Sequence, residues 1–491
     1  MYRVSALIGL SALFLAWLLY FCFWSATSRL PAAPGPWLAR FTRLWYLKAL
    51  VRGDFEQVNI ALHRKYGKIV RLEPNSYSID DPEAIRTIYT ISNPWVKSSW
   101  YGPSCPPGTT TNFSTPDNKD AARFRRNYAQ AFSMSSILAF EPLIDECGEL
   151  LIEKLKTFAK SGETVDLTHW FSCWAFDCQG HITFSERFGF LVKGEDIGGI
   201  CESLRQRMSY AAFVGVYPEL HPTLFKIVNW LAGPGTGKVD YTISYTLQRI
   251  AQRKEGGEKF DRKDMLAQFL AGQQRDPANF SDWDVLIGAF GNIVAGADTT
   301  WITLSAIIYF LLKNRRCLDK VRKEIDDMVK TGSISDPISF HESQQMPYCQ
   351  AVIKEGQRLY PGTGLPLFRV VPKGGAMIAG TYFPEGAVVG INNWVAHYNK
   401  DVFGPDADVF RPERWLEGDT TAMNRYYIPF GVGPRACQGL NVALMEMSKF
   451  VPQLVRHLDF DLLSEWKTEN RWLMFQSNIN VKVKMRDSQV R

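Results

Sequence analysis

The sequence predicts a mainly α protein with a minor β part, behind one N-terminal transmembrane helix. Apolar residues recur at helical spacing over 142–160, 315–330 and 440–458. β-branched and aromatic residues stand between turn formers over 68–81 and 376–393, as in strands. A run from Val4 to Ser25 carries no charge. These three observations together predict a helical body with small sheets, attached to a membrane.

Length and composition describe a globular body large enough to bury a cofactor. The chain has 491 residues, of which 46% are hydrophobic and 13% aromatic. Its net charge of +6 comes from Lys and Arg scattered among nearly as many carboxylates, so we expect no nucleic acid partner. Nine irregularly spaced cysteines favour free thiols in a reducing compartment over a disulfide framework.

Residues 1–28 are predicted to form a membrane anchor, followed by a Pro-rich connector at 29–37 and a single large domain at 38–491. At about 1.5 Å per residue the charge-free run is long enough to cross the hydrocarbon core. A cleaved signal peptide is the alternative, but its apolar region is usually only about 7–15 residues long. Positive charge follows the run rather than preceding it, which favours a cytosolic body.

The stretch 281–314 is the longest helical candidate. Ser281 can cap its start and no proline interrupts it, so at about 1.5 Å per residue it would run roughly 50 Å. A second transmembrane span is the alternative. Asn292, Asp298 and the neighbouring threonines at its centre would be costly in lipid. We therefore expect a helix buried through the middle of the protein, with its polar cluster facing a cavity.

Two other patterns fail as functional motifs. The glycine-rich segment 233–240 lacks the first glycine of a phosphate-binding loop, and valine follows its lysine. His169, Cys173, Cys178 and His181 have the composition of a zinc site, but on one helix they spread over about half of the circumference. We expect a loop in the first case and ordinary core residues in the second.

The pattern Glu-x-x-Arg occurs three times, at Glu83/Arg86, Glu202/Arg205 and Glu355/Arg358. On a helix each is an ordinary ion pair, usually at the surface. The third lies among apolar residues, and a buried pair needs further partners. Arg414, in the segment FRPERW, could supply one.

The segment FGVGPRACQGL, residues 430–440, places the one cysteine of the last hundred residues in a glycine-rich loop. Gly431, Gly433 and Gly439 permit tight turns and close backbone approach. Cys437 would stand just before a helix that begins near Leu440, where the helix dipole favours a thiolate. A thiolate so placed is a nucleophile or a metal ligand, and none of His341, His397 and His457 stands in an obvious motif for a general base.

At six positions this loop resembles the haem-binding loop of the cytochromes P450: Phe430, Gly431, Gly433, Arg435, Cys437 and Gly439. The order of the other motifs fits the same family, with AGADTT at 295–300, then Glu355-x-x-Arg358, then FRPERW. The segments RLYPGTGLPLFRVVPKGG and AHYNKDVFGPDADVFRPERW are most similar to fungal microsomal members of the pisatin-demethylase-like group. The resemblance covers everything after the anchor.

The resemblance implies the cytochrome P450 fold, a large helical domain with a small β-rich region, and haem b as cofactor. Cys437 would be the axial thiolate ligand of the haem iron, with Phe430 shielding the sulfur. Arg435, Arg369 and Arg125 would hold the propionates, whereas Ala121 stands where the family pattern has Trp or His. Asp298 and Thr299 would be the acid and alcohol that relay protons, and Gly296 would give oxygen room. Glu355, Arg358 and Arg414 would be structural.

The resemblance further implies a monooxygenase that inserts one oxygen atom from O₂ into a hydrophobic small molecule, in fungal secondary metabolite biosynthesis. The reaction would be hydroxylation, epoxidation, oxidative demethylation or ring coupling. Electrons would come from NADPH through a separate NADPH-cytochrome P450 reductase, and cytochrome b5 is a further expected partner. Arg123, Arg125 and Arg126 are candidate docking residues, the alternative being a solvated helix face. The expected location is the endoplasmic reticulum membrane, single-pass, with the catalytic domain cytosolic.

Two alternatives stay open: an electron-independent haem-thiolate isomerase or dehydratase, and a non-catalytic membrane haem-binding protein. Retention of both Asp298 and Thr299 argues against each. By analogy, the substrate pocket would be lined by largely apolar and aromatic segments, although the same side chains would suit ordinary core packing. These segments are 98–115, 205–235, Phe290, Val294, 363–368 and 472–475. Asn112 and Asn279 begin glycosylation sequons that a cytosolic body would leave unmodified.

Overall fold

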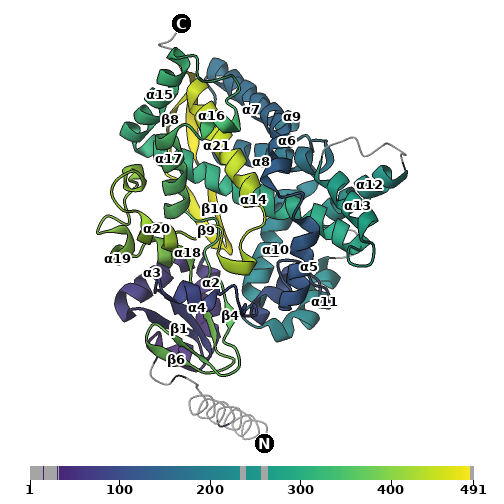
Figure 1. Cartoon of the computed structure of the whole chain (residues 1–491), viewed down its shortest axis with the longest axis vertical. Helices are drawn as coiled ribbons and strands as arrows, with labels where there is room; N and C mark the ends of the chain where they lie inside the picture. Colours follow the sequence, from purple (N-terminus) through teal and green to yellow (C-terminus); the bar gives the residue numbers. More distant parts are fainter. Residues whose placement is uncertain (1–14, 16–29, 31–32, 233–238, 256–263, 487–491) are drawn as a thin grey trace, which may run out of the picture.

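The computed structural model describes residues 15, 30, 33–232, 239–255 and 264–486. The predicted anchor at 1–28, apart from Leu15, and a third of the connector lie outside the described residues. The rest is a mainly helical body in which the strands form small separate sheets, as the sequence predicts (Figure 1).

Helices make up most of the described chain. The α-helices are α2 Leu44–Arg52, α3 Phe55–Tyr66, α4 Ala84–Ile88, α5 Asn118–Tyr128, α6 Met134–Ala139, α7 Glu141–Ser161, α8 Leu167–Phe184, α9 Phe190–Lys193, α10 Ile200–Val214, α11 His221–Ala232, α12 Val239–Glu255, α13 Met265–Arg275, α14 Asp282–Lys313, α15 Arg315–Lys330, α16 Phe340–Ser343, α17 Pro347–Leu359, α18 Asn393–His397, α19 Lys400–Phe403, α20 Thr421–Tyr426 and α21 Leu440–His457. The 3₁₀ helices are η1 Trp37–Arg40, η2 Ser99–Ser104, η3 Ile197–Gly199, η4 Pro218–Leu220, η5 Pro412–Trp415 and η6 Gly433–Arg435.

The strands belong to small sheets that join distant parts of the chain. They are β1 Ile69–Glu73, β2 Ser76–Ile79, β3 Thr164–Asp166, β4 Arg369–Val370, β5 Ala376–Ile378, β6 Thr381–Phe383, β7 Val388–Gly390, β8 Leu458–Leu462, β9 Lys467–Arg471, β10 Leu473–Ser477 and β11 Asn480–Met485. One sheet has the order β1-β2-β7-β4, in which β2 and β7 are parallel. Another has the order β3-β11-β8, and β9-β10 and β5-β6 are antiparallel pairs.

The elements predicted from hydrophobic spacing are confirmed within a residue or two. The predicted helix at 315–330 is α15, and those at 142–160 and 440–458 are α7 and α21. The segment at 68–81 forms the β1-β2 hairpin. In α7 and α15 the buried residues recur at helical spacing, so the local pattern and the tertiary packing agree.

The central helix α14 is confirmed in detail. Ser281 caps it through a capping box with Asp284, and the helix ends at Lys313. Among the described helices it is the one long and apolar enough to cross a membrane, but 67% of its most apolar window is buried inside the protein. It packs most extensively on α8 and lies in the middle of the molecule (Figure 1). It is therefore a core helix, as predicted from its polar centre.

One large hydrophobic core and two smaller ones stabilise the fold. The larger core joins α7, α8, α14, α15, α17 and α21 around buried aromatic and aliphatic side chains. Two smaller clusters lie under the β1-β2-β7-β4 sheet and around α2 and α3, in the lower part of Figure 1. The loop that carries Cys437 leads directly into α21, so the larger core fixes its position.

Candidate functional site

The cysteine loop is closed by its own backbone. The Cys437 N–H donates to the carbonyl of Phe430, with N and O 2.8 Å apart. Gly431 and Gly433 have φ of +67° and +74°, the left-handed region that glycine adopts without cost. A Cβ on Gly433 would stand 2.3 Å from the carbonyl oxygen of Tyr89, so this position has no room for a side chain.

The backbone conformation at Gly439 does not need a glycine, although the sequence predicts that all three glycines of the loop permit tight turns. Its φ is −80°, which any residue adopts. A Cβ there would stand 3.9 Å from the sulfur of Cys437, which is an ordinary van der Waals contact, so the protein atoms leave room for a side chain at this position.

Cys437 faces an internal hollow. The residue is exposed although it sits between the larger core and the β-rich region. Burial raises the pKa of its thiol, while the N–H of Gly439 and the guanidinium of Arg125 act in the opposite direction. The expectation that the start of the helix favours a thiolate stays a prediction, and a bound metal ion would favour the thiolate further.

One face of α14 is open in the middle of the core. Ala295 is exposed and Thr299 half-buried, although Ala297, Asp298 and Thr300 beside them are buried. A Cβ on Gly291, one turn before Ala295, would meet no atom within 4 Å. Residues 291, 295 and 299 share one side of a helix. The hollow therefore runs along this face.

The predicted acid, Asp298, and the predicted alcohol, Thr299, lie on α14 next to this open face. The Thr299 hydroxyl donates to the carbonyl of Ala295 at 2.8 Å. Asp298 is 3% exposed and accepts a hydrogen bond from the Trp301 indole N–H at 3.0 Å. Burial raises the pKa of Asp298 to about 7, against the Trp301 hydrogen bond and the charge of Arg205. A carboxyl with such a pKa exchanges its proton near neutrality.

Gly296 packs on a polar side chain and does not face the hollow. A Cβ there would stand 2.6 Å from the amide end of Gln179, on α8. Gln179 donates to Glu446 on α21 at 3.0 Å and accepts from Asn292 at 3.0 Å. The expectation that Gly296 gives oxygen room stays a prediction. Sequence reasoning missed Gln179 and Glu446, because their contacts join segments more than a hundred residues apart.

The three predicted propionate-binding arginines lie around the cysteine loop. Arg125 donates to the carbonyl of Ala436 at 2.7 Å, Arg435 to that of Thr115 at 2.6 Å, and Arg369 to that of Phe368 at 2.9 Å. Within the described residues none of them pairs with a carboxylate. Burial lowers the pKa of Arg435 to about 10, with Arg369 and Arg125 adding to the effect. Such a cluster lacks an anion, and the two carboxylates of haem would neutralise it. The residues present therefore fit haem.

A further buried cation, Lys97, was missed. It is 6% exposed, and its ammonium donates to the carbonyl of Phe113 at 2.7 Å. The backbones of Lys97 and Arg369 pair in an isolated antiparallel β-bridge. At position 121, where the family pattern has Trp or His, the buried alanine offers no polar group. A lysine in an unassigned segment between helices gives no signal in the sequence.

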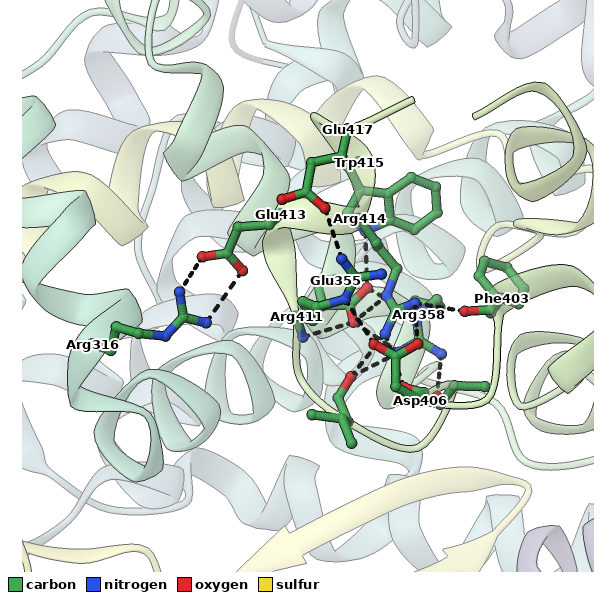
Figure 2. Close-up of polar contacts among 12 residues, drawn as sticks. Arg316, Glu355, Arg358, Phe403, Asp406, Arg411, Glu413, Arg414, Trp415 and Glu417 are labelled. Atoms are coloured by element: carbon green, nitrogen blue, oxygen red, sulfur yellow. Dashed lines mark hydrogen bonds and ion pairs between the residues drawn. The ribbon is translucent and has the colours of Figure 1, made fainter. Parts of the chain in front are cut away.

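Glu355 is the centre of a fully buried polar network (Figure 2). Glu355 and Arg358 are 0% exposed and Arg414 is 2% exposed. Both carboxylate oxygens accept from Arg358 at 2.8 Å, one accepts from Arg414 at 2.9 Å, and the other accepts from the Trp415 indole at 2.9 Å. The other two Glu-x-x-Arg patterns form no ion pair within the described residues. Arg205 pairs with Glu469 instead of Glu202. Glu83 and Arg86 are both exposed at the surface.

His397 connects this network to the cysteine loop. Its Nε2 accepts from the backbone N–H of Ile428 at 2.9 Å, so its Nδ1 carries the proton and donates to the carbonyl of Arg358 at 3.0 Å. Burial and the charge of Arg358 lower the pKa of His397 to about 3, so the ring is neutral. Ile428 stands two residues before Phe430. The network therefore fixes the start of the loop.

The predicted pocket segments 98–115 and 472–475 come together as an aromatic wall. Trp100 and Trp472 have ring centroids 4.8 Å apart, and Phe113 and Trp472 have centroids 5.0 Å apart. On α14, Phe290 is buried and lies under the guanidinium of Arg207 from α10, 5.5 Å from the ring centroid. Apolar surface therefore dominates this side of the hollow.

Other predicted groups do not converge. Among the residues that the structure describes, no three metal-binding side chains come together, so the four His and Cys residues on α8 form no zinc site.

Arg123 forms ion pairs with Asp120 and Asp284, and Arg125 donates to the cysteine loop. Of the expected docking residues, Arg126 remains exposed. The amide of Asn112 donates to Gln438 at 2.8 Å, which is incompatible with a glycan in this conformation.

Comparison with known proteins gives a consistent result. The family profile described as Cytochrome P450 matches residues 31–484. The chain is 36% identical to a pisatin demethylase of Fusarium vanettenii, over 93% of this chain and 91% of that protein. It is 35% identical to the cytochrome P450 monooxygenase cicH of Emericella nidulans, over 95% and 96%, and 34% identical to gsfF of Penicillium aethiopicum, over 97% and 98%. With the thiol, the cation cluster and the buried Glu355 network in the positions described above, the chain belongs to the cytochrome P450 family.

Proposed function

We propose that the protein uses haem to insert one oxygen atom from O₂ into a hydrophobic small molecule. The observation that supports this most directly is the exposed thiol of Cys437 in the interior, beside buried cations that lack an anion. Bound there, haem supplies the redox chemistry that activates oxygen. Cys437 would ligate the iron, Arg125, Arg369 and Arg435 would hold the propionates, and Phe430 with its flanking glycines would enclose the sulfur.

Asp298 and Thr299 are the residues that we assign to proton delivery. Asp298 has a pKa near neutrality and a fixed hydrogen bond to Trp301, so it can take up and release protons without a large rearrangement. The Thr299 hydroxyl borders the hollow and can carry a hydrogen bond to a bound oxygen species or water. Glu355, Arg358 and Arg414 would hold the protein around the loop and take no part in the reaction.

The substrate would be a hydrophobic small molecule of fungal secondary metabolism. The aromatic wall of Trp100, Phe113 and Trp472 favours a flat apolar ligand. One of the similar proteins carries the name pisatin demethylase, which supports demethylation as one of the candidate reactions. The choice between hydroxylation, epoxidation, demethylation and ring coupling is a property of the substrate that binds.

Electrons would reach the protein from NADPH through NADPH-cytochrome P450 reductase, with cytochrome b5 as a second donor. Arg126 and Lys119, both exposed on α5, are available for such acidic partners. Residues 38–491 would form the catalytic domain, and residues 1–28 would anchor it in the endoplasmic reticulum membrane with the domain cytosolic.

A second observation supports the membrane proposal. Leu38 and Leu44 near the start of the domain are 48% and 60% exposed, and Trp230 and Leu231 on α11 are 78% and 70% exposed. Arg43, beside Leu44, pairs with Glu219 at 2.5 Å, two residues before α11 begins. We call these four residues the apolar patch. Its size and position suit contact with a bilayer surface.

Turnover with purified reductase tests the proposed function. Wild type should consume NADPH and O₂ when a substrate is present, and Asp298→Asn should lower product formation by a factor of about 10² or more, the usual contribution of a proton donor. Product formation without NADPH would instead identify an isomerase or dehydratase. Stable haem binding with no NADPH consumption against a broad apolar library would identify a non-catalytic haem protein.

A further inference from the structure

Arg207 brings a positive charge to the hollow beside the open face of α14. It lies on α10, and its guanidinium stands over the ring of Phe290 on α14, 5.5 Å from the ring centroid. Burial lowers the pKa of Arg207, although the side chain is only half-buried. Cys437 shows the same combination, since burial shifts its pKa although the residue has accessible surface. Both side chains therefore border the interior hollow and not bulk solvent.

This guanidinium lacks an anion. Among the described residues no carboxylate acts on its pKa. Its Nη2 donates to the neutral carbonyl of Ser104 at 3.3 Å, and its Nη1 is buried without a hydrogen-bond partner in the described part of the chain. The ring of Phe290 stabilises a cation only modestly, whereas an unpaired buried charge is costly. An anion that enters the hollow would remove this cost.

The side chains around Arg207 supply no negative charge. His221 on α11 is buried, and burial lowers its pKa, so the ring is neutral at pH 7. Its Nε2 donates to the carbonyl of Cys105 at 3.0 Å, and its Nδ1 accepts from the Tyr210 hydroxyl at 2.8 Å. The thiol of Cys105 donates to the carbonyl of Thr109 at 3.1 Å. These contacts fix the end of η2 beside Arg207 and leave its charge without a partner.

The charge lies far along the hollow from the residues assigned to proton delivery. Phe290, under the guanidinium, and Thr299 are nine positions apart on α14. At about 1.5 Å per residue this separation is about 13 Å along the helix axis. The face between them is open, since a Cβ on Gly291 would meet no atom within 4 Å. A ligand that reaches from Arg207 to Thr299 is therefore elongated.

We propose that Arg207 binds a carboxylate of the substrate, at the end of the molecule remote from the site of oxidation. The assignment rests on the proposed function and narrows its substrate class to flat, elongated apolar molecules with a carboxylate at one end. A guanidinium holds a carboxylate through two parallel hydrogen bonds, which fix the direction of the ligand as well as neutralising the charge. Arg207 then decides which end of the substrate faces Thr299.

Binding of planar acids and their neutral esters to ferric holoenzyme measures this role without turnover. The probes are naphthalene-, anthracene- and pyrene-carboxylic acids, each with its methyl ester, and equilibrium dialysis gives the dissociation constants. We expect wild type to bind at least one acid about tenfold tighter or more than its ester, because only the acid forms a charge-assisted pair. Arg207→Met should abolish this preference by weakening binding of the acid and sparing the ester.

Further variants separate the charge of Arg207 from its contact with Ser104. Arg207→Lys keeps the charge without the planar fork, so its preference should fall between those of wild type and Arg207→Met. Arg64→Met removes an exposed arginine of α3 and is the matched control, which should leave both constants unchanged. Arg207→Gln gives the same comparison if Arg207→Met does not fold. Equal weakening of acid and ester would show that Arg207 acts through the Ser104 carbonyl, and would overturn the proposal.

Failure of this assignment differs from failure of the proposed function. If wild type carries thiolate-ligated haem but binds no acid of the series tighter than its ester, the assignment of Arg207 is wrong and the proposed function stands. If folded wild type binds no haem, the proposed function fails and the assignment fails with it.

Discussion

Burial decides what the same residue pattern does. The pair Glu355/Arg358 is 0% exposed and is bonded further by Arg414 and Trp415, whereas Glu83 and Arg86 have the same spacing and lie at the surface. A buried carboxylate is stabilised by all of its donors together, and removing it leaves the buried guanidinium of Arg358 without a carboxylate. The surface pair contributes little because water and salt screen it.

Replacing Glu355 should therefore be far more damaging than replacing Glu83. We expect Glu355→Ala to lower the free energy of unfolding by about 3–5 kcal/mol and to weaken haem retention. Glu83→Ala should change it by no more than about 0.5 kcal/mol. Urea denaturation of both variants checks this. Equal effects of the two replacements would mean that the network around Glu355 does not stabilise the fold.

The carboxyl of Asp298 gives the stability a defined pH dependence. Its pKa is about 7 in the folded protein, against about 3.9 for an unfolded aspartate. Between these values the folded state keeps a proton that the unfolded chain has lost, so this group makes stability fall as pH rises towards 7. Asp298→Asn removes the effect. The variant should gain stability relative to wild type between pH 5 and pH 8, measured by urea denaturation. An unchanged difference would contradict the raised pKa.

Among individual residues, the sequence predicted those that stand in motifs and missed those that act through tertiary contacts. Cys437, Asp298 and Glu355 stand in short patterns whose chemistry is readable. Lys97 and His397 gave no local signal, because their partners lie on other segments. The contact of Gly296 with Gln179 was also missed, since Gln179 is 117 residues away in the chain and only the fold brings the two together.

The central helix α14 combines a packed side and an open side. Gly296 lies against Gln179, whose amide connects α8, α14 and α21. Gly291 faces open space. Two of the three glycines of this helix therefore differ, because Gly296 allows close packing and Gly291 meets no steric need.

Alanine replacements should distinguish the packed glycine, Gly296, from the unpacked one, Gly291. Gly296→Ala forces the Gln179 amide to move and should destabilise the protein by about 1–3 kcal/mol. Gly291→Ala should stabilise it by about 0.5–1 kcal/mol, because alanine favours a helix interior. Urea denaturation checks both, and Gln179→Ala should remove most of the penalty at Gly296. Destabilisation by Gly291→Ala of equal size would mean that its Cβ meets a packed neighbour.

Helices and strands with one clear apolar face were predicted within a residue or two, and others were not. The sheet that joins β3, β8 and β11 links residue 164 to residue 482, and nothing in the local sequence predicts that pairing. The register of such a sheet depends on the whole fold and not on the period of one strand.

At the scale of the whole molecule, the apolar patch joins the first elements of the domain to α11. Both lie in the lower part of Figure 1, near the β1-β2-β7-β4 sheet. If this end rests on a membrane, the pocket side of the domain would stand beside the lipid in which hydrophobic substrates dissolve.

A variant that begins at residue 30 should still bind phospholipid vesicles through the patch. Adding Trp230→Asp and Leu231→Asp should reduce vesicle binding about tenfold or more, since a buried large apolar side chain contributes about 1.5–3 kcal/mol. Val192→Asp, at a residue 68% exposed on α9, is the matched control and should have little effect. Vesicle sedimentation measures this. Equal loss with Val192→Asp would argue against a defined membrane face.

The ligation of haem by Cys437 is the central claim, and one spectrum tests it most directly. The dithionite-reduced protein is recorded with and without carbon monoxide, for wild type and for Cys437→Ala. We predict the strongly red-shifted Soret band of a thiolate-ligated haem in wild type and its loss in the variant. A folded wild type without haem, or the same spectrum after Cys437→Ala, would contradict the account.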